Sequence, residues 1–176
     1  MLNQENTFLK GFFMLRHRFA ISLSGFIWMG VGIFLLHKGL QYFSAVGPQI
    51  FNKTHEGFSL ILLLGSIVGT PEKGAMVLLC IGLVLGFFKG RIILKKSVRR
   101  IVNRIRSMPS PISIKKLYPK EYYFLIGGMM LLGFVFKFLP LPLDVKGFID
   151  FTIGIALING AMLYFRAAFI PEKAHL

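Results

Sequence analysis

Acidic residues and cysteines are scarce in this 176-residue chain. It contains 7 Asp and Glu against 21 Lys and Arg, and Cys80 is the only cysteine. A single cysteine excludes an internal disulfide, and its apolar neighbours indicate a small buried side chain rather than a redox centre. The four histidines are scattered, so no group of His, Cys, Asp and Glu has the spacing of a metal site. We therefore expect no cofactor and no metal ion.

Motifs of the common enzyme classes are also missing. The sequence has no phosphate-binding glycine loop and no dinucleotide-binding glycine pattern. An intramembrane enzyme could draw on His55, Glu56, Ser66 and Glu72, but no spacing relates these side chains to one another. We therefore expect a protein that is not an enzyme.

Apolar residues, in contrast, are abundant. Hydrophobic residues make up 55% of the chain and aromatic residues 14%, which is more than one soluble core of this size needs. A nucleic-acid-binding protein can carry a net charge of +14, but it would not contain runs long enough to cross a bilayer core of about 30 Å. The composition argues against nucleic acid as a partner and predicts an all-α integral membrane protein.

Four apolar stretches predict transmembrane helices that pair as two helical hairpins. The predicted spans are residues 19–36, 71–88, 121–139 and 147–165. Residues 57–69 are also apolar, but about 13 residues fall short of the roughly 20 that a span needs. We predict a short re-entrant or interfacial helix there, with a fifth span as the alternative.

This pattern divides the chain into three regions. The first is an N-terminal membrane hairpin with the short re-entrant segment and a basic helical extension, the second a cytoplasmic linker, and the third a C-terminal membrane hairpin. Their boundaries are residues 1–106, 107–120 and 121–176.

The second predicted span has a clear start and continues beyond the membrane. Thr70 can cap a helix, Pro71 suits the first helical position, and Glu72 favours the positive end of the helix dipole. No helix-breaking residue follows until Pro109, so a helix of about 36 residues, or some 54 Å, is predicted.

The last third of this helix is amphipathic. Leu94, Val98, Ile101 and Ile105 recur at helical spacing, and basic residues occupy the other faces. Such a segment suits the headgroup region of an anionic leaflet. The residues expected to contact anionic lipid are Arg91, Lys95, Lys96, Arg99, Arg100, Arg104 and Arg106.

The distribution of charge predicts the orientation of the chain. Residues 89–120 contain 11 of the 21 Lys and Arg residues and no acidic residue. Basic segments next to membrane spans stay in the cytoplasm. We expect the protein in the inner (plasma) membrane of a bacterium, with this segment cytoplasmic in both the four-span and the five-span arrangement.

Two of the predicted spans carry small residues at every fourth position. A shift of 70 residues aligns Gly82, Gly86 and Gly90 with Thr152, Ala156 and Gly160. Small residues at this spacing let helix backbones approach closely in lipid. The alignment predicts that these two helices contact each other, and it suggests a weak internal duplication.

Several polar or backbone features could form a transport path or a binding site. Intramembrane charges are costly, and a broken helix at membrane depth leaves free amide and carbonyl groups. A pair of Lys137 and Asp150 across the hairpin could line such a path. The structural alternatives are an ion pair of Asp150 with Lys146, a Lys137 side chain that reaches the outer interface, and a hydrogen bond from Asn159 to another helix. The candidates are Gly65, Ser66, Thr70, Glu72, Lys137, Asp150 and Asn159.

Two classes of function follow. The first is an oligomeric transporter or channel subunit for an ion or small solute, since four helices enclose little space and an internal duplication is typical of transporters. The second is a membrane scaffold or complex subunit whose basic cytoplasmic helix binds anionic lipid or an acidic partner. Both classes predict a homo-oligomer or a subunit of a membrane complex.

Overall fold

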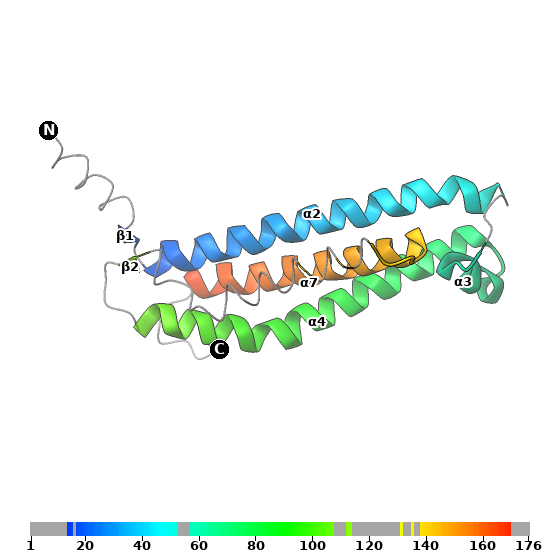
Figure 1. The fold of residues 1–176 in the computed structure, drawn as a ribbon. Helices are drawn as coiled ribbons and strands as arrows, with labels where there is room; N and C mark the ends of the chain where they lie inside the picture. The colour runs from blue at the N-terminus through cyan, green and yellow to red at the C-terminus, as the bar shows by residue number, and fades with distance from the viewer. Residues whose placement is uncertain are drawn as a thin grey trace, which may run out of the picture.

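The computed structural model describes residues 14, 15, 17–52, 57–107, 112, 113, 131, 135 and 138–169. Its regular secondary structure is helical, apart from the two-residue strands β1 (Met14–Leu15) and β2 (Ile112–Ser113), which pair antiparallel. Three of its helices are long and apolar enough to cross a membrane. The predicted span 121–139 lies almost entirely outside the described residues. The four helices are α2 (His17–Phe51), α3 (Leu60–Val68), α4 (Pro71–Ser107) and α7 (Leu143–Phe169) (Figure 1).

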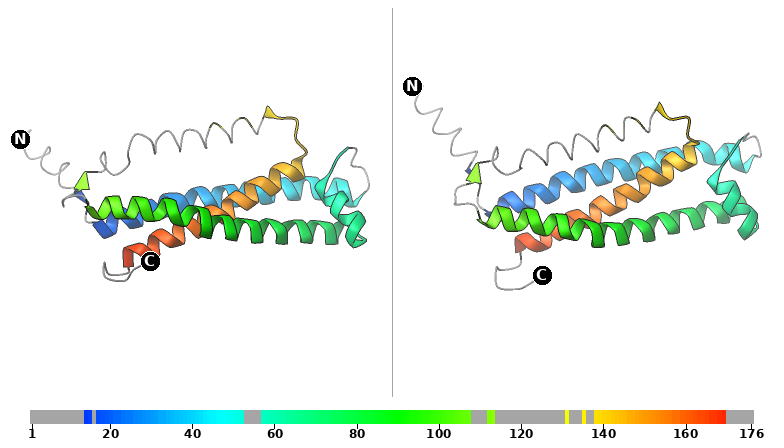
Figure 2. Two further views of the ribbon diagram at one scale, coloured as in Figure 1. Left: turned by 90° about the horizontal axis from the view of Figure 1, so that it is seen from below. Right: turned by 60° about the horizontal axis from the view of Figure 1, so that its bottom comes forward.

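The three long helices lie side by side (Figures 1 and 2). Helix α2 runs antiparallel to α7, whereas α4 runs parallel to it. Both α2 and α4 pack along α7, while α2 and α4 contact each other only slightly. The start of α2, the end of α4 and the end of α7 therefore share one end of the bundle, which we call the basic end. The opposite end holds α3, and we call it the α3 end.

Helix α2 extends well beyond the predicted span 19–36. It passes through Pro48 and ends at Phe51, where the Asn52 amide donates to the Pro48 carbonyl at 3.0 Å. The added turns are stabilised by burial of Val46 and Ile50 among side chains of α3 and α4. Helix α7 likewise exceeds its predicted range of 147–165. Both predicted spans lie inside longer helices, because hydropathy locates the apolar part of a helix and not its ends.

Helix α4 confirms its predicted start and length. Thr70 Oγ1 accepts a hydrogen bond from the Lys73 amide at 3.4 Å, Pro71 is the first helical residue, and Glu72 lies in the first turn. The helix has 37 residues, against the predicted 36.

Helix α3 occupies most of the predicted segment 57–69. Ser59 caps its start and Gly69, with a φ of 101°, caps its end. Its 9 residues rise only about 13 Å, which is less than half of a bilayer core. This short helix does not have the length of a fifth span.

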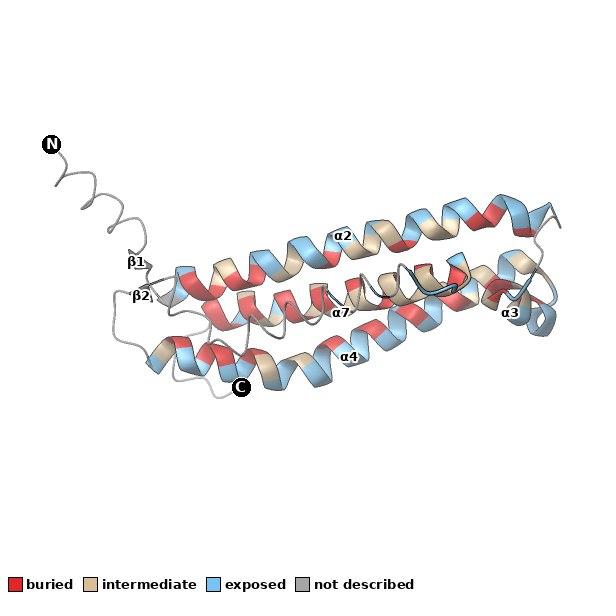
Figure 3. Ribbon diagram, in the orientation of Figure 1, coloured by how far each residue is buried: buried red, intermediate tan, exposed pale blue. Residues whose placement is uncertain are grey.

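The apolar stripe on the last turns of α4 is buried inside the bundle (Figure 3). The amphipathic pattern predicts a segment at the lipid headgroups, but its apolar stripe packs within the chain. The expected contacts of its basic residues with anionic lipid stay a prediction. Helices α2 and α7 extend equally far and cover the stripe. The cluster comprises Ala20, Ile21, Val98, Ile101, Val102, Ile105, Tyr164, Ala167 and Ala168.

Candidate functional site

Glycines set the contact between α2 and α7. A methyl group at Gly39 would lie 2.6 Å from the Phe151 amide nitrogen, and one at Gly154 would lie 2.7 Å from the Leu36 amide nitrogen. At such distances no side chain fits between the two helices, so the backbone of α2 contacts the backbone of α7. This is the more extensive helix contact, and the sequence analysis missed it. A visible signal was the spacing of seven residues that relates the glycines at positions 25, 32 and 39 and at 147 and 154.

The small residues of α4 lie against α7. A methyl group at Gly86 would lie 2.7 Å from the Thr152 carbonyl oxygen, and one at Gly90 would lie 2.6 Å from the Ala156 carbonyl oxygen. Asn159 borders this contact, where we expected a hydrogen bond between helices. Its amide instead donates to the Ile155 carbonyl of its own helix at 3.0 Å. Gly82 lies against side chains of α7, and Gly160 lies against Leu94.

A buried carboxylate fixes α3 to the start of α7. Asp144 Oδ2 accepts hydrogen bonds from Ser59 Oγ at 2.7 Å and from the Ile61 amide at 3.2 Å. The carboxylate lies in the first turn of α7 and at the start of α3, so both helix dipoles favour its negative charge. The sequence analysis missed Asp144 because its partners lie more than 80 positions away.

The predicted residues at the junction of α3 and α4 act as caps and packing surfaces. A methyl group at Gly74 of α4 would lie 2.5 Å from the Gly65 amide nitrogen, so the two helices cross with backbones in contact. Ser66 Oγ donates to the Leu63 carbonyl at 2.8 Å. Thr70 caps α4, and Glu72 is exposed in its first turn. Local structure therefore explains each of these four candidates.

An ion pair joins α2 to α7 near the α3 end. Lys38 Nζ lies 3.5 Å from Asp150 Oδ2, and the two side chains are 35% and 19% exposed. Lys38 Nζ also lies 5.5 Å from the centre of the Tyr42 ring. Lys38 is a site residue that the sequence analysis missed, although it flanks the first predicted span. Lys137, which we considered as a partner of Asp150, lies outside the described residues.

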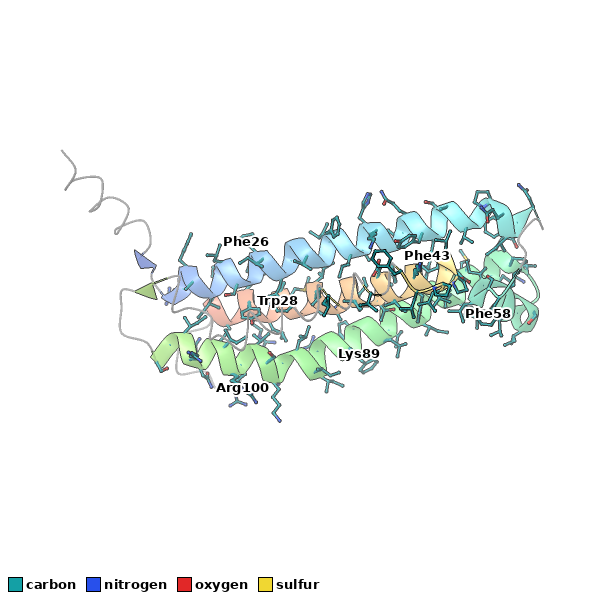
Figure 4. All side chains as sticks on the ribbon, in the orientation of Figure 1. Phe26, Trp28, Phe43, Phe58, Lys89 and Arg100 are labelled. Atoms are coloured by element: carbon teal, nitrogen blue, oxygen red, sulfur yellow. The ribbon has the colours of Figure 1, made fainter. Side chains whose placement is uncertain are left out.

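Positive charge gathers at the basic end from three helices. From Lys89, near the middle of α4, to the basic end, nine of the ten Lys and Arg side chains that the structure describes are exposed, and Arg100 points away from the bundle (Figure 4). The tenth, Arg106, donates to the Ala167 carbonyl at 2.9 Å. The adjoining stretches 17–35, 89–107 and 156–169 contain no Asp or Glu. The exposed residues are Arg18, Lys89, Arg91, Lys95, Lys96, Arg99, Arg100, Arg104 and Arg166.

No family model, curated protein or solved structure matches this chain. Among the described residues, no three His, Cys, Asp or Glu side chains are placed to hold a metal ion. The chemistry on which a function can be argued is therefore that of the basic end and of the ion pair near the α3 end.

Proposed function

We propose that this chain is a non-enzymatic membrane scaffold or complex subunit whose basic end binds anionic lipid headgroups. The observation that carries the proposal is the group of nine exposed cations between the middle of α4 and the basic end, with no acidic residue in the same stretches. Each Lys or Arg near an anionic membrane surface contributes about 1 kcal/mol of attraction. The cations project from a packed bundle, so they are held at defined positions.

The packing supports a scaffold over the transporter that the sequence alone favoured. Because α2 meets α7, and α4 meets α7, backbone to backbone at glycines, these contact lines leave no room for a solute path between the paired helices. A path would need further helices, from this chain or from another copy.

The positive-inside rule supports an orientation for the scaffold. The basic end would lie on the cytoplasmic side of a bacterial inner membrane, and the α3 end on the opposite side. Among the described residues of the α3 end, Lys38, Lys73 and Lys146 are accompanied by Glu72, Asp144 and Asp150, so cations and acids are equal in number.

The second candidate function is an oligomeric transporter or channel subunit. The ion pair of Lys38 and Asp150 favours it, because ionisable groups inside membrane spans often mark ion or proton pathways. Solute flux into liposomes tests this candidate. Flux that is lost in Asp150→Asn would favour a transporter, and absence of flux for every ion tested would favour the scaffold.

Retention of lipid by the purified full chain tests the scaffold proposal. We expect native mass spectrometry to detect several phosphatidylglycerol molecules on the wild type and fewer phosphatidylcholine molecules. The triple variant Arg99→Gln, Arg100→Gln, Arg104→Gln should lose much of this preference. The matched variant with Lys at the same three positions keeps the charge and should keep the preference. Equal retention by all three proteins would contradict the proposal.

A further inference from the structure

Near the basic end, α2 and α4 present different chemistry at the same level of the bundle. Contacts with α7 define this level: Gly90 of α4 lies against Ala156, and Gly32 of α2 lies against Gly154 and Ile158. The residues just after Gly90 therefore lie at nearly the level of those just before Gly32. On α2 the residues at this level are apolar, and Val31 is exposed. On α4, Lys89 precedes Gly90 and Arg91 follows it, and Ile92 is exposed beside them.

The apolar surfaces of the two helices end at different levels. On α2 the surface stays free of charged side chains up to Arg18, but on α4 cations interrupt the apolar surface from Lys89 onward, with Ile92 and Ile93 still exposed among them. Ala20 and Ile21 pack in one cluster with Val102, so Arg18 lies near the level of Val102. The step from Lys89 to Val102 corresponds to about 20 Å along the helix axis.

A tilt of the bundle in the membrane accounts for only part of the difference in level between the ends of the two apolar surfaces. Helices α2 and α4 both pack on α7, and packed axes lie 8–10 Å apart, so α2 and α4 are at most about 20 Å apart. At the mean tilt of about 20°, this separation offsets the two helices by only about 7 Å relative to the membrane plane. Extended Lys and Arg side chains shorten the remaining gap by several Å but do not close it.

The exposed face of α4 has the chemistry to bind a phospholipid in the remaining gap. Exposed apolar side chains, among them Phe88 and Ile92, alternate with the cations. The Arg91 guanidinium lies over the Phe87 ring at 5.7 Å from its centre, which leaves the edge N–H groups available to a phosphate. Cations beside apolar side chains suit an anionic headgroup whose acyl chains continue along the same helix.

We propose that the outer face of α4 from Lys89 to Arg100 binds anionic phospholipids and draws their headgroups toward the bilayer centre, which thins the adjoining leaflet. This inference rests on the proposed function, which requires only that the basic end binds anionic lipid. Helix α2 keeps acyl chains beside it at the same level, so the thinning is confined to the α4 side.

Depth measurements on two matched positions test the thinning. Ile92 is 67% exposed on α4, and Val31 is 44% exposed on α2 at nearly the same level. Each is replaced by Cys in a full-length Cys80→Ala background and carries a spin label in liposomes of phosphatidylcholine with phosphatidylglycerol. Power saturation with oxygen and the neutral complex Ni(II)-EDDA reports the depth of each label without a charge bias. We expect the ratio of Ni(II)-EDDA to oxygen accessibility to be several-fold higher for the label at position 92.

Two further samples link this difference to anionic lipid. The difference should shrink in phosphatidylcholine alone, and also in the variant Lys95→Gln, Lys96→Gln, Arg99→Gln, Arg100→Gln. A difference that persists in both samples would overturn the inference. The depth of the two labels would then depend on how the bundle lies in the bilayer and not on anionic lipid.

Failure of the inference and failure of the proposed function are distinguishable. Equal depth at positions 92 and 31, with phosphatidylglycerol still retained in native mass spectra, would overturn the thinning and leave the proposed function standing. If the wild type retains phosphatidylglycerol no better than phosphatidylcholine, both the thinning and the proposed function are overturned.

Discussion

The two ends of the bundle treat charge in opposite ways. At the α3 end, Asp144 accepts hydrogen bonds from Ser59 and Ile61, and Asp150 pairs with Lys38, so these two acidic groups have partners within the chain. At the basic end, nine exposed cations have no acidic residue in the stretches around them. Internal pairing is what a structural role requires, whereas a concentration of one sign of charge suits an external partner. The difference supports the proposal that the exposed charges of the basic end bind an external partner, whereas the acids Asp144 and Asp150 hold helices together.

The largest expected effect comes from breaking the glycine contact that holds both ends in register. Gly39→Leu places a side chain where even a methyl group would lie 2.6 Å from the backbone of α7. We expect a loss of about 3 kcal/mol or more in stability, measured by unfolding in detergent. Gly30→Leu is the matched control on α2, because a methyl group there meets no atom within 4 Å. Equal losses for both variants would show that the glycine contact does not hold the helices together.

The next largest effect concerns the buried carboxylate of the α3 end. Asp144→Ala leaves Ser59 and the Ile61 amide without their acceptor, which should cost about 1–3 kcal/mol. Hydrogen–deuterium exchange should accelerate in residues 60–68 before it does in α2. Ser66→Ala removes an exposed hydroxyl of the same helix and serves as the control. Unchanged exchange in α3 after loss of Asp144 would contradict its role in fixing that helix.

A smaller effect is expected for the ion pair. Lys38→Met or Asp150→Asn alone leaves one partly buried charged group without its partner. Because removing both partners avoids that penalty, the double variant should be more stable than the sum of the single losses predicts, by about 1 kcal/mol. Additive losses in a double-mutant cycle would show that the two side chains do not interact.

The smallest effect on stability is expected at the basic end. Replacing Arg99, Arg100 and Arg104 with Gln removes exposed charges that repel one another, so stability should change by no more than about 0.5 kcal/mol. Thermal unfolding in neutral detergent measures this change. A large loss would show that these three side chains make contacts that stabilise the fold, and it would weaken the contrast between the ends.

Local sequence signals predicted several elements of the fold correctly. Thr70, Pro71 and Glu72 start α4 as expected, because helix capping depends on neighbouring residues. The stripe with Val98 and Ile105 is buried, because helical periodicity identifies a buried face. Periodicity does not identify what covers that face, and we expected headgroups where the structure has α2 and α7.

Contacts between distant segments were beyond the reach of local patterns. Asp144 follows a proline-rich turn and has no distinctive neighbour, so its role emerges only when α3 lies beside it. In the sequence, Lys38 is an ordinary basic residue beside a membrane span. Its pairing with Asp150 depends on the packing of α7 against α2. The glycines of α2 and α7 were visible as a seven-residue spacing, but a spacing alone does not select a partner helix.

Hydrogen–deuterium exchange of the full chain in neutral detergent, with and without added phosphatidylglycerol, tests the contrast between the ends most directly. The account predicts that the lipid slows exchange in residues 99–107 of α4 and leaves residues 60–68 of α3 unchanged. Protection of α3, or an unchanged end of α4, would contradict it.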